Sequence, residues 1–348
     1  MRDLSEVEGT AGGSGSESGS SSAPASSAPS GDASEDGGYA YASDVSAHRL
    51  VGADVCEIAG LVGGDSIDFE AAEAVYRDGR NSVNSDGTMR TLAGFAVAAD
   101  RKHGLNAYYD TPTPLDEWVS GALAGTGRFA GQDEAARAEA VEKGVQNQIL
   151  VAWMIHELES AMAKAADGNF DPASGAVHNW DEAWAYYHGA NPQCAPYSTA
   201  DKRAGNFGTT GSGETALANE AILEAMNTGR DALIGGDTDS ARESADEVIR
   251  NLFITYSQAS VRYASLVVED LGESDTASAS KHRAEGLAFF RVIEAIAASA
   301  GADVDSINAV YDPAAELGER GDGDTVRAAL QPAWDTLGIT ADDIGYLD

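Results

Sequence analysis

The sequence predicts an all-α protein, a helical bundle of long antiparallel helices. The stretch 145–164 (VQNQILVAWMIHELESAMAK) contains no Gly or Pro. A set of its residues recurs at alternating spacings of four and three, so these residues share one face of a helix. From residue 41 onward, Asp, Ser or Thr precedes most segments rich in helix formers and Gly follows them, which is typical of helix ends. The alternation of apolar and polar residues that indicates strands is absent from the sequence.

Taken in order, the segments rich in helix formers predict ten helices, and the three longest form the core. Residues 1–40 are expected to be a disordered Gly/Ser-rich linker, because residues 9–38 carry no large apolar side chain, and residues 41–348 an all-helical domain. Residues 169–211 are expected to be a long irregular segment with one short helix, of the kind that is often functional. The helices are placed at 44–62, 68–78, 86–100, 115–123, 132–166, 180–188, 213–228, 238–269, 275–299 and 324–336.

The charge of the chain excludes some classes of partner. With 57 acidic and 22 basic residues the net charge is −35, and no basic cluster is present that could bind nucleic acid or an anionic membrane. Since 43% of the residues are hydrophobic, the chain is expected to fold, and its acidity suggests a halophilic protein that works in high salt. No run of about 18 apolar residues predicts a membrane span, and the first 30 residues lack the apolar core of a signal peptide.

Two cysteines, Cys56 and Cys194, are too far apart in sequence for a C-x-x-C motif. They are equally compatible with one long-range disulfide and with two buried thiols. The sequence leaves both alternatives open.

Two polar residues interrupt the expected buried face of the 145–164 helix. His156 and Glu159 occupy positions where the spacing from Val145 and Ile149 predicts apolar side chains. A buried imidazole and a buried carboxylate need partners. A metal ion is one such partner, and a hydrogen bond between helices is the alternative.

A second His-x-x-Glu pair lies on the predicted helix 275–299, where His282 and Glu285 share a face with Phe289 and Ile296. Helical bundles hold metals with such i, i+3 pairs on facing helices, supplemented by single carboxylates. The two pairs predict a metal site between the long helices.

A third group of candidate ligands lies in the short helix 180–188 and the residues just before it. His178, Asp181 and His188 fall on one helical face, whereas Trp180 and Trp184 fall on another. The aromatic face is expected in the core, and the His/Asp face is either surface or a second metal-binding cluster.

The chain also contains a weak similarity between two of its segments, which we call the echo. His48 is followed by Tyr76 after 28 residues, and His282 by Tyr311 after 29, with similar residues between them. An internal duplication of a helix pair would explain this pattern, and a site built from both halves is then conceivable.

Imidazole and carboxylate together suit iron, Fe²⁺ or Fe³⁺, better than calcium or magnesium, which prefer oxygen, or copper(I), which prefers thiolate; zinc stays open. Among enzyme motifs, the sequence holds no G-x-S-x-G, phosphate loop, H-E-x-x-H or Rossmann fingerprint. Binding without turnover is therefore expected, with a ferroxidase-like di-iron oxidase as the enzymatic alternative and a purely structural cell-surface domain as the third.

Four long stretches carry a resemblance to a known family: AEAVYRDGRNSVNSDGTMRTLAGFA, QILVAWMIHELESAMAKA, NWDEAWAYYHG followed by CAPYSTADKRAGNFGT, and AEGLAFFRVIEAIA. Through them residues 41–348 resemble the algal low-iron-inducible, iron-assimilating periplasmic proteins, also described as high-CO2-inducible, which have prokaryotic relatives. The resemblance implies an all-helical secreted or periplasmic protein that assists iron uptake. Around His156 the chain is also similar to the imelysin-like iron-regulated proteins, over a few residues.

Together these observations predict an extracytoplasmic iron-binding protein, extracellular or at the cell surface and tethered through its N-terminal linker. Its expected partners are the metal ion and a membrane iron transporter, with no nucleic acid and no direct membrane insertion.

Overall fold

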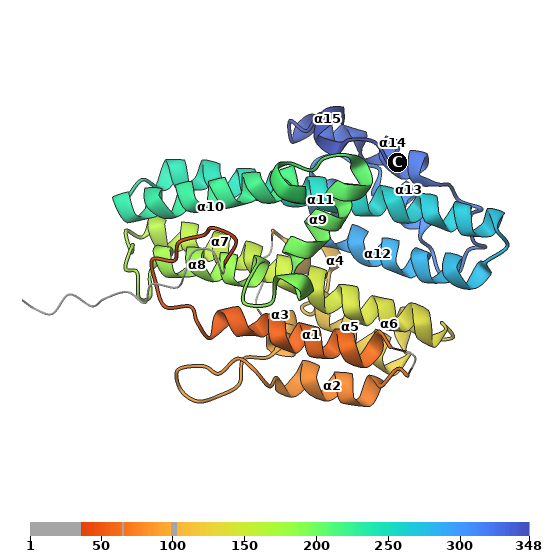
Figure 1. Ribbon diagram of the computed structural model, residues 1–348, viewed down its shortest axis with the longest axis horizontal. Helices are drawn as coiled ribbons and strands as arrows, with labels where there is room; N and C mark the ends of the chain where they lie inside the picture. Colours follow the sequence, from red (N-terminus) through yellow and green to blue (C-terminus); the bar gives the residue numbers. More distant parts are fainter. Residues whose placement is uncertain (1–35, 65, 99–102, 348) are drawn as a thin grey trace, which may run out of the picture.

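The computed structural model describes residues 36–64, 66–98 and 103–347, and within them the protein is a bundle of α-helices without β-strands (Figure 1). Only two isolated bridges, Val83 with Met89 and Thr210 with Ala216, pair extended residues. The predicted all-α class is confirmed. The α-helices are α1 (Val51–Val62), α2 (Phe69–Asp78), α3 (Leu92–Val97), α4 (Leu105–Tyr109), α5 (Pro114–Ala124), α6 (Glu134–Lys143), α7 (Leu150–Ala166), α8 (Ala176–Tyr187), α9 (Pro196–Phe207), α10 (Leu217–Gly235), α11 (Thr238–Gly272), α12 (Thr276–Ser299), α13 (Val304–Val310), α14 (Gly323–Thr336) and α15 (Ala341–Ile344).

The long helix α11 organises the bundle. It packs along α10 on one side and α12 on the other, while α7 pairs with α8 in the adjacent part of the molecule (Figure 1). Helices α1, α2, α5 and α6 form the opposite side of the bundle. No helix in the described ranges is long and apolar enough to cross a membrane.

Short local signals in the sequence determine where several helices begin. Asp237, Asp275 and Asp303 each accept a hydrogen bond from the backbone N–H of the serine three residues later, at the starts of α11, α12 and α13. Such a cap satisfies one of the donors that a helix N-terminus leaves without a partner. The predicted starts at residues 238 and 275 are therefore close to those observed.

The predicted helix 132–166 consists of α6, a π-helical segment η4 (Gly144–Ile149) and α7. A π-helical turn holds one residue more than an α-helical turn, so it changes the face on which later residues lie. In α7 the buried polar residues are Glu157 and Ser160, whereas His156 and Glu159 are only partly buried. The prediction that His156 and Glu159 continue the buried face of Val145 and Ile149 is therefore wrong. The buried polar positions are one residue later in each case.

Other boundaries differ from prediction for local reasons. Of the predicted helix 86–100, only Leu92–Val97 is described as helical, because Asp86 and Thr88 form a tight turn through Gly87, whose φ is 85°. Helix α9 lies in the segment 169–211, where a single short helix was expected. Helices α4, α13 and α15 are short and were not predicted.

The proposed duplication finds no support in the packing of the two tyrosines. A Cβ on Gly286 would lie 2.2 Å from the ring of Tyr311, so this glycine and this tyrosine are in direct contact. The atoms nearest to a Cβ on Gly52 belong to Asn191 and not to Tyr76, whose hydroxyl bonds Asp116 instead. The two tyrosines therefore pack differently in the two segments.

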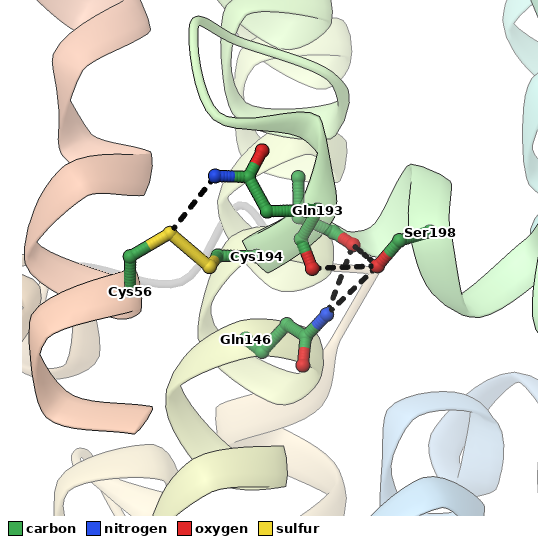
Figure 2. The surroundings of a disulfide bond; sticks show 6 residues. Cys56, Gln146, Gln193, Cys194 and Ser198 are labelled. Atoms are coloured by element: carbon green, nitrogen blue, oxygen red, sulfur yellow. Dashed lines mark hydrogen bonds between the residues drawn. A yellow bond between two sulfur atoms is a disulfide. The ribbon is translucent and has the colours of Figure 1, made fainter. Parts of the chain in front are cut away.

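Cys56 on α1 and Cys194 in the turn η5 (Pro192–Cys194) form a disulfide, with a Cα–Cα distance of 5.3 Å (Figure 2). Of the two alternatives that the sequence allows, the bridge is the one observed. It joins α1 to the chain just after α8, next to the hydrogen bonds of Gln146 with Ala195 and Ser198.

Residues 1–35 of the predicted linker lie outside the described residues, but Asp36 and Tyr39 among its last five residues are buried against the domain. Tyr39 is fully buried and stacks on Trp184, and the carbonyl of Asp36 accepts a hydrogen bond from the Trp184 indole. The packed part of the chain therefore includes residue 36, earlier than the predicted boundary at residue 41.

Candidate metal centre

Two imidazoles and one carboxylate meet beside α8. The Nε2 atoms of His48 and His178 each lie 3.0 Å from Oε1 of Glu182. One potential ligand atom from each of the three residues lies within 4.8 Å of the others, which is close enough for a single ion to contact all three. In the described part of the chain, no other group of three such side chains is this compact.

Local helix geometry and one crossing turn assemble this cluster. His178 and Glu182 are four residues apart on α8, so their side chains share a face. His48 belongs to the 3₁₀ turn η2 (His48–Leu50), which packs on α8 and is held there by a hydrogen bond from the Ala190 N–H to the carbonyl of Arg49. The side chains of His48, His178 and Glu182 are 13%, 19% and 11% exposed, so the site lies just beneath the surface.

The residues behind His178 fix its orientation. The Ser43 hydroxyl donates to Oδ2 of Asp181 at 2.7 Å, so its oxygen accepts a hydrogen bond from Nδ1 of His178 at 3.1 Å. Nδ1 therefore carries a proton in this arrangement, and Nε2 is the nitrogen that faces Glu182. Such carboxylate-supported orientation is characteristic of histidines that bind metals.

A second carboxyl group adjoins the cluster. Glu157 of α7 is buried and hydrogen-bonded to Glu182, and it accepts a hydrogen bond from the Asn179 amide. Burial, together with the negative charge of Glu182, raises the pKa of Glu157 well above its usual range. The raised pKa favours the protonated form of Glu157, which is the form that can donate to Glu182, and loss of this proton would make Glu157 a further potential ligand.

The same contacts shift the pKa values of the three central residues. Burial alone would raise the pKa of Glu182, but hydrogen bonds from His178 and His48 outweigh it, and the pKa is lowered. The hydrogen bond to Glu182 raises the pKa of His178 above its usual value, against the opposing effect of burial. The lowered pKa favours the carboxylate form of Glu182, and the raised pKa favours the protonated form of His178, whose proton a metal ion would have to displace.

Arg90 adds a positive charge to one side of the site. Its Nη2 lies 2.7 Å from Nε2 of His48, and its Nη1 donates to Ser82 at 2.8 Å. An ion bound to His48 would have to share this nitrogen or displace the guanidinium.

The structure does not bring together the two predicted His-x-x-Glu pairs. His156 stacks on Trp153, with ring centroids 4.3 Å apart, and Glu159 contacts His103 at 3.6 Å. Neither pair belongs to the compact group of potential ligands in the described residues, because α7 packs mainly on α8 and α12 mainly on α11.

His282 and Glu285 belong to a separate charged cluster. His282 pairs with Asp270 at 2.6 Å, and its Nε2 lies 4.0 Å from Glu285. Lys143 approaches Glu285 to 3.9 Å, and burial together with the nearby Glu139 raises the pKa of Glu285 to about 8. A lysine therefore already supplies the positive charge beside this glutamate.

Of the predicted residues on α8, His178 lies in the compact group and Asp181 lies behind it. Asp181 accepts hydrogen bonds from the Tyr39 hydroxyl, from the backbone N–H groups of Ala42 and Ser43, and from the Ser43 hydroxyl. Burial raises its pKa, and these hydrogen bonds offset part of that effect. Asp181 is thus placed to support His178. His188, on the same predicted face, stacks on Trp184 instead.

Sequence reasoning missed Glu182 and Glu157 as potential ligands, and it noted His48 only as part of the echo. The i, i+4 spacing of His178 and Glu182 is a signal that could have identified Glu182. Nothing in the local sequence around His48 indicates that it reaches α8.

Comparison with protein families matches residues 19–348 to the family described as low iron-inducible periplasmic protein. The match covers nearly the whole chain. No curated protein and no solved structure matches the chain significantly.

Proposed function

Because the chain belongs to the low iron-inducible periplasmic protein family, we propose that it binds iron outside the cytoplasm for assimilation, with His48, His178 and Glu182 as ligands. The observation that carries this proposal is the convergence of both imidazole Nε2 atoms on one carboxylate oxygen, 3.0 Å from each. The partial exposure of the three side chains would let a membrane iron transporter receive the ion from the site.

The ligand chemistry favours ferrous iron over the common alkaline-earth ions. Two imidazoles and one carboxylate form a set that proteins use for non-haem Fe²⁺, whereas Ca²⁺ and Mg²⁺ are bound mainly by oxygen. Loss of the Glu157 proton would add a second carboxylate, which would strengthen the attraction to the cation. Zinc accepts the same ligands, so the choice of metal has to be measured against zinc.

The test is anaerobic Fe²⁺ titration of the full chain in high salt, which suppresses loose binding to surface carboxylates. The test variants are a His48→Ala/His178→Ala double variant and Glu182→Gln. The matched control is a His156→Ala/His282→Ala double variant, which removes the same number of histidines from outside the cluster. Circular dichroism confirms that each variant keeps its helical content.

We expect one tightly bound ion in the wild type and in the control, and loss of that ion in both test variants. Loss of binding in the control alone would instead support the long-helix site built from His156 and His282. Absence of stoichiometric iron in the wild type would refute the proposal and favour a structural role.

One feature favours an enzymatic alternative, iron oxidation. Two histidines and one carboxylate would supply three ligands to an iron ion and would leave its other positions open to water or oxygen. Oxygen consumption on adding Fe²⁺ to the wild type, lost in Glu182→Gln, would indicate a ferroxidase. Iron binding without oxygen consumption would indicate a carrier.

A further inference from the structure

Two arginines share one tryptophan ring on a side of the bundle that contains none of the proposed iron ligands. The guanidinium carbons of Arg128 and Arg291 lie 5.3 and 4.9 Å from the centroid of Trp118, and that of Arg291 lies 4.1 Å from the Tyr109 ring. Arg291 comes from α12, Trp118 from α5, and Arg128 from the turn η3 (Gly127–Phe129). Three separate segments therefore place two positive charges around one aromatic ring.

Neither arginine has an acidic partner. In the described ranges, no carboxylate oxygen lies within 4.0 Å of either guanidinium. Arg291 is only 9% exposed, and its buried Nε makes no hydrogen bond there. Burial of an unpaired charge is costly, and arginine cannot avoid it by losing its proton. In a chain with 57 acidic residues, two arginines without an ion pair are unexpected, and Glu294 and Asp312 act on Arg128 only from beyond this distance.

Burial and the positive charge of Arg291 both act on the guanidinium of Arg128. The protein atoms around its guanidinium limit its hydration, and the charge of Arg291 adds to this effect, so the pKa of Arg128 is lowered from its usual value. Arginine side chains carry a positive charge at neutral pH. An anion placed between them would relieve the repulsion.

A cavity of about 690 Å³ adjoins the pair, with Trp118, Arg128 and Arg291 in its wall. Its acidic members already have donors: Glu73 pairs with Arg77, Asp116 accepts from Tyr76 and Ser120, and Glu117 accepts from Thr111. Arg128 and Arg291 are thus the cationic groups of the wall that have no carboxylate within 4.0 Å. A second cavity, of about 420 Å³, shares Tyr109, Arg128 and Arg291 with the first.

We propose that Arg128 and Arg291 form a binding site for a small organic or inorganic oxyanion that carries a carboxylate or phosphate group. The planar, multi-donor guanidinium matches both groups, and stacking on Trp118 and Tyr109 holds each donor set in a fixed orientation. The volume of the cavity lies within the range of small-molecule sites and exceeds what inorganic phosphate alone would fill. The site shares no residue with the iron cluster, so the two proposals can be tested independently.

The test is isothermal titration calorimetry of the metal-free full chain with inorganic phosphate and, separately, with succinate, in low salt. The test variants are Arg291→Gln, Arg291→Lys and Arg128→Gln. The matched control is Arg242→Gln, which removes an exposed arginine from α11. Because Arg128 is exposed at the cavity, its variant tests the site without disturbing the packing around buried Arg291.

We expect saturable binding of one anion in the wild type and in Arg242→Gln, weakened about tenfold or more in Arg128→Gln and in Arg291→Gln. Arg291→Lys is expected to keep part of the affinity that Arg291→Gln loses. Lysine keeps the positive charge but lacks the planar guanidinium that donates two parallel hydrogen bonds. Binding of phosphate alone identifies a phosphate ligand, and binding of succinate alone a carboxylate ligand. No saturable binding of either anion, or equal binding by all variants, would overturn the proposal.

Discussion

The Nη2 of Arg90 lies 2.7 Å from Nε2 of His48, the same nitrogen that lies 3.0 Å from Oε1 of Glu182. A guanidinium and a metal ion both carry positive charge, and they would compete for this nitrogen. At separations near 4 Å the repulsion between two charges in a protein amounts to a few kcal/mol. We therefore expect Arg90→Gln to bind Fe²⁺ about tenfold or more tightly than the wild type in anaerobic titrations.

The control for this experiment is Arg80→Gln, which removes an arginine of the same loop whose ion pair is with Glu57, outside the cluster. Its affinity for Fe²⁺ is expected to equal that of the wild type. If Arg90→Gln bound iron less tightly than Arg80→Gln, Arg90 would be orienting His48 for the metal and not competing with it.

Metal affinity is expected to rise steeply with pH. The pKa values of His178 and Glu157 are both raised. Each residue therefore keeps its proton to a higher pH than a residue with the usual pKa would. A metal ion must displace those protons, which makes affinity fall as pH drops through the raised pKa of His178, above its usual value of about 6.5. Each proton released contributes about tenfold per pH unit.

Calorimetry in buffers of different ionisation enthalpy counts these protons directly. Glu157→Gln is expected to release fewer protons on binding than the wild type, and Glu159→Gln, on the partly exposed side of α7, the same number. Proton release that is unchanged in Glu157→Gln would show that Glu157 takes no part in binding.

The fold class could be predicted because it depends on local signals. Asp residues at positions such as 237 and 275 and the uninterrupted helix formers of α11 and α12 are visible within short windows of sequence. The short helices α13 and α15 were missed because they contain too few residues to establish a period.

The candidate site was less predictable, for two physical reasons. The π-helical segment η4 offsets the face of α7 by one residue, so that Glu157 takes the buried position that the spacing had assigned to His156. The second reason is distance along the chain, since His48 reaches His178 only through the packing of η2 on α8. Within α8 itself, His178 was predicted as a ligand, whereas Glu182, one helical turn later, was not.

The disulfide is expected to stabilise both the fold and the site. It closes a loop with a sequence separation of 138 residues, and it fixes α1, which follows His48, to the chain after α8, which carries His178. Reduction is expected to lower the free energy of unfolding by roughly 2–5 kcal/mol and to weaken iron binding. Urea unfolding and Fe²⁺ titration with and without reductant measure the two effects.

A Cys56→Ser/Cys194→Ser variant serves as the control, because its stability should not respond to reductant. If the reduced wild type bound iron as tightly as the oxidised protein, the bridge would stabilise the fold without positioning His48.

Stability is expected to increase with salt concentration. The net charge of −35 produces repulsion across the folded surface, and raising the ionic strength from about 0.1 M to about 1 M shortens the screening length from about 10 Å to about 3 Å. Melting temperatures in sodium chloride and in potassium chloride at equal ionic strength should rise together. A melting temperature that is flat or falls over this range would contradict the halophilic interpretation.

The contact between Gly286 and Tyr311 leads to a last prediction about packing. A Cβ added to Gly286 would lie 2.2 Å from Cε1 of Tyr311, whose buried ring is held by a hydrogen bond from its hydroxyl to the carbonyl of Ser260. Because the added Cβ would overlap a buried ring whose hydroxyl is hydrogen-bonded, Gly286→Ala is expected to destabilise the protein by about 1–3 kcal/mol. Gly60, inside α1, has no atom within 4 Å of such a Cβ, so Gly60→Ala is expected to stabilise it by about 0.5–1 kcal/mol. Opposite shifts in urea unfolding midpoints would establish this contact as a constraint on the packing of α12, whereas stabilisation by both variants would show that the ring moves aside.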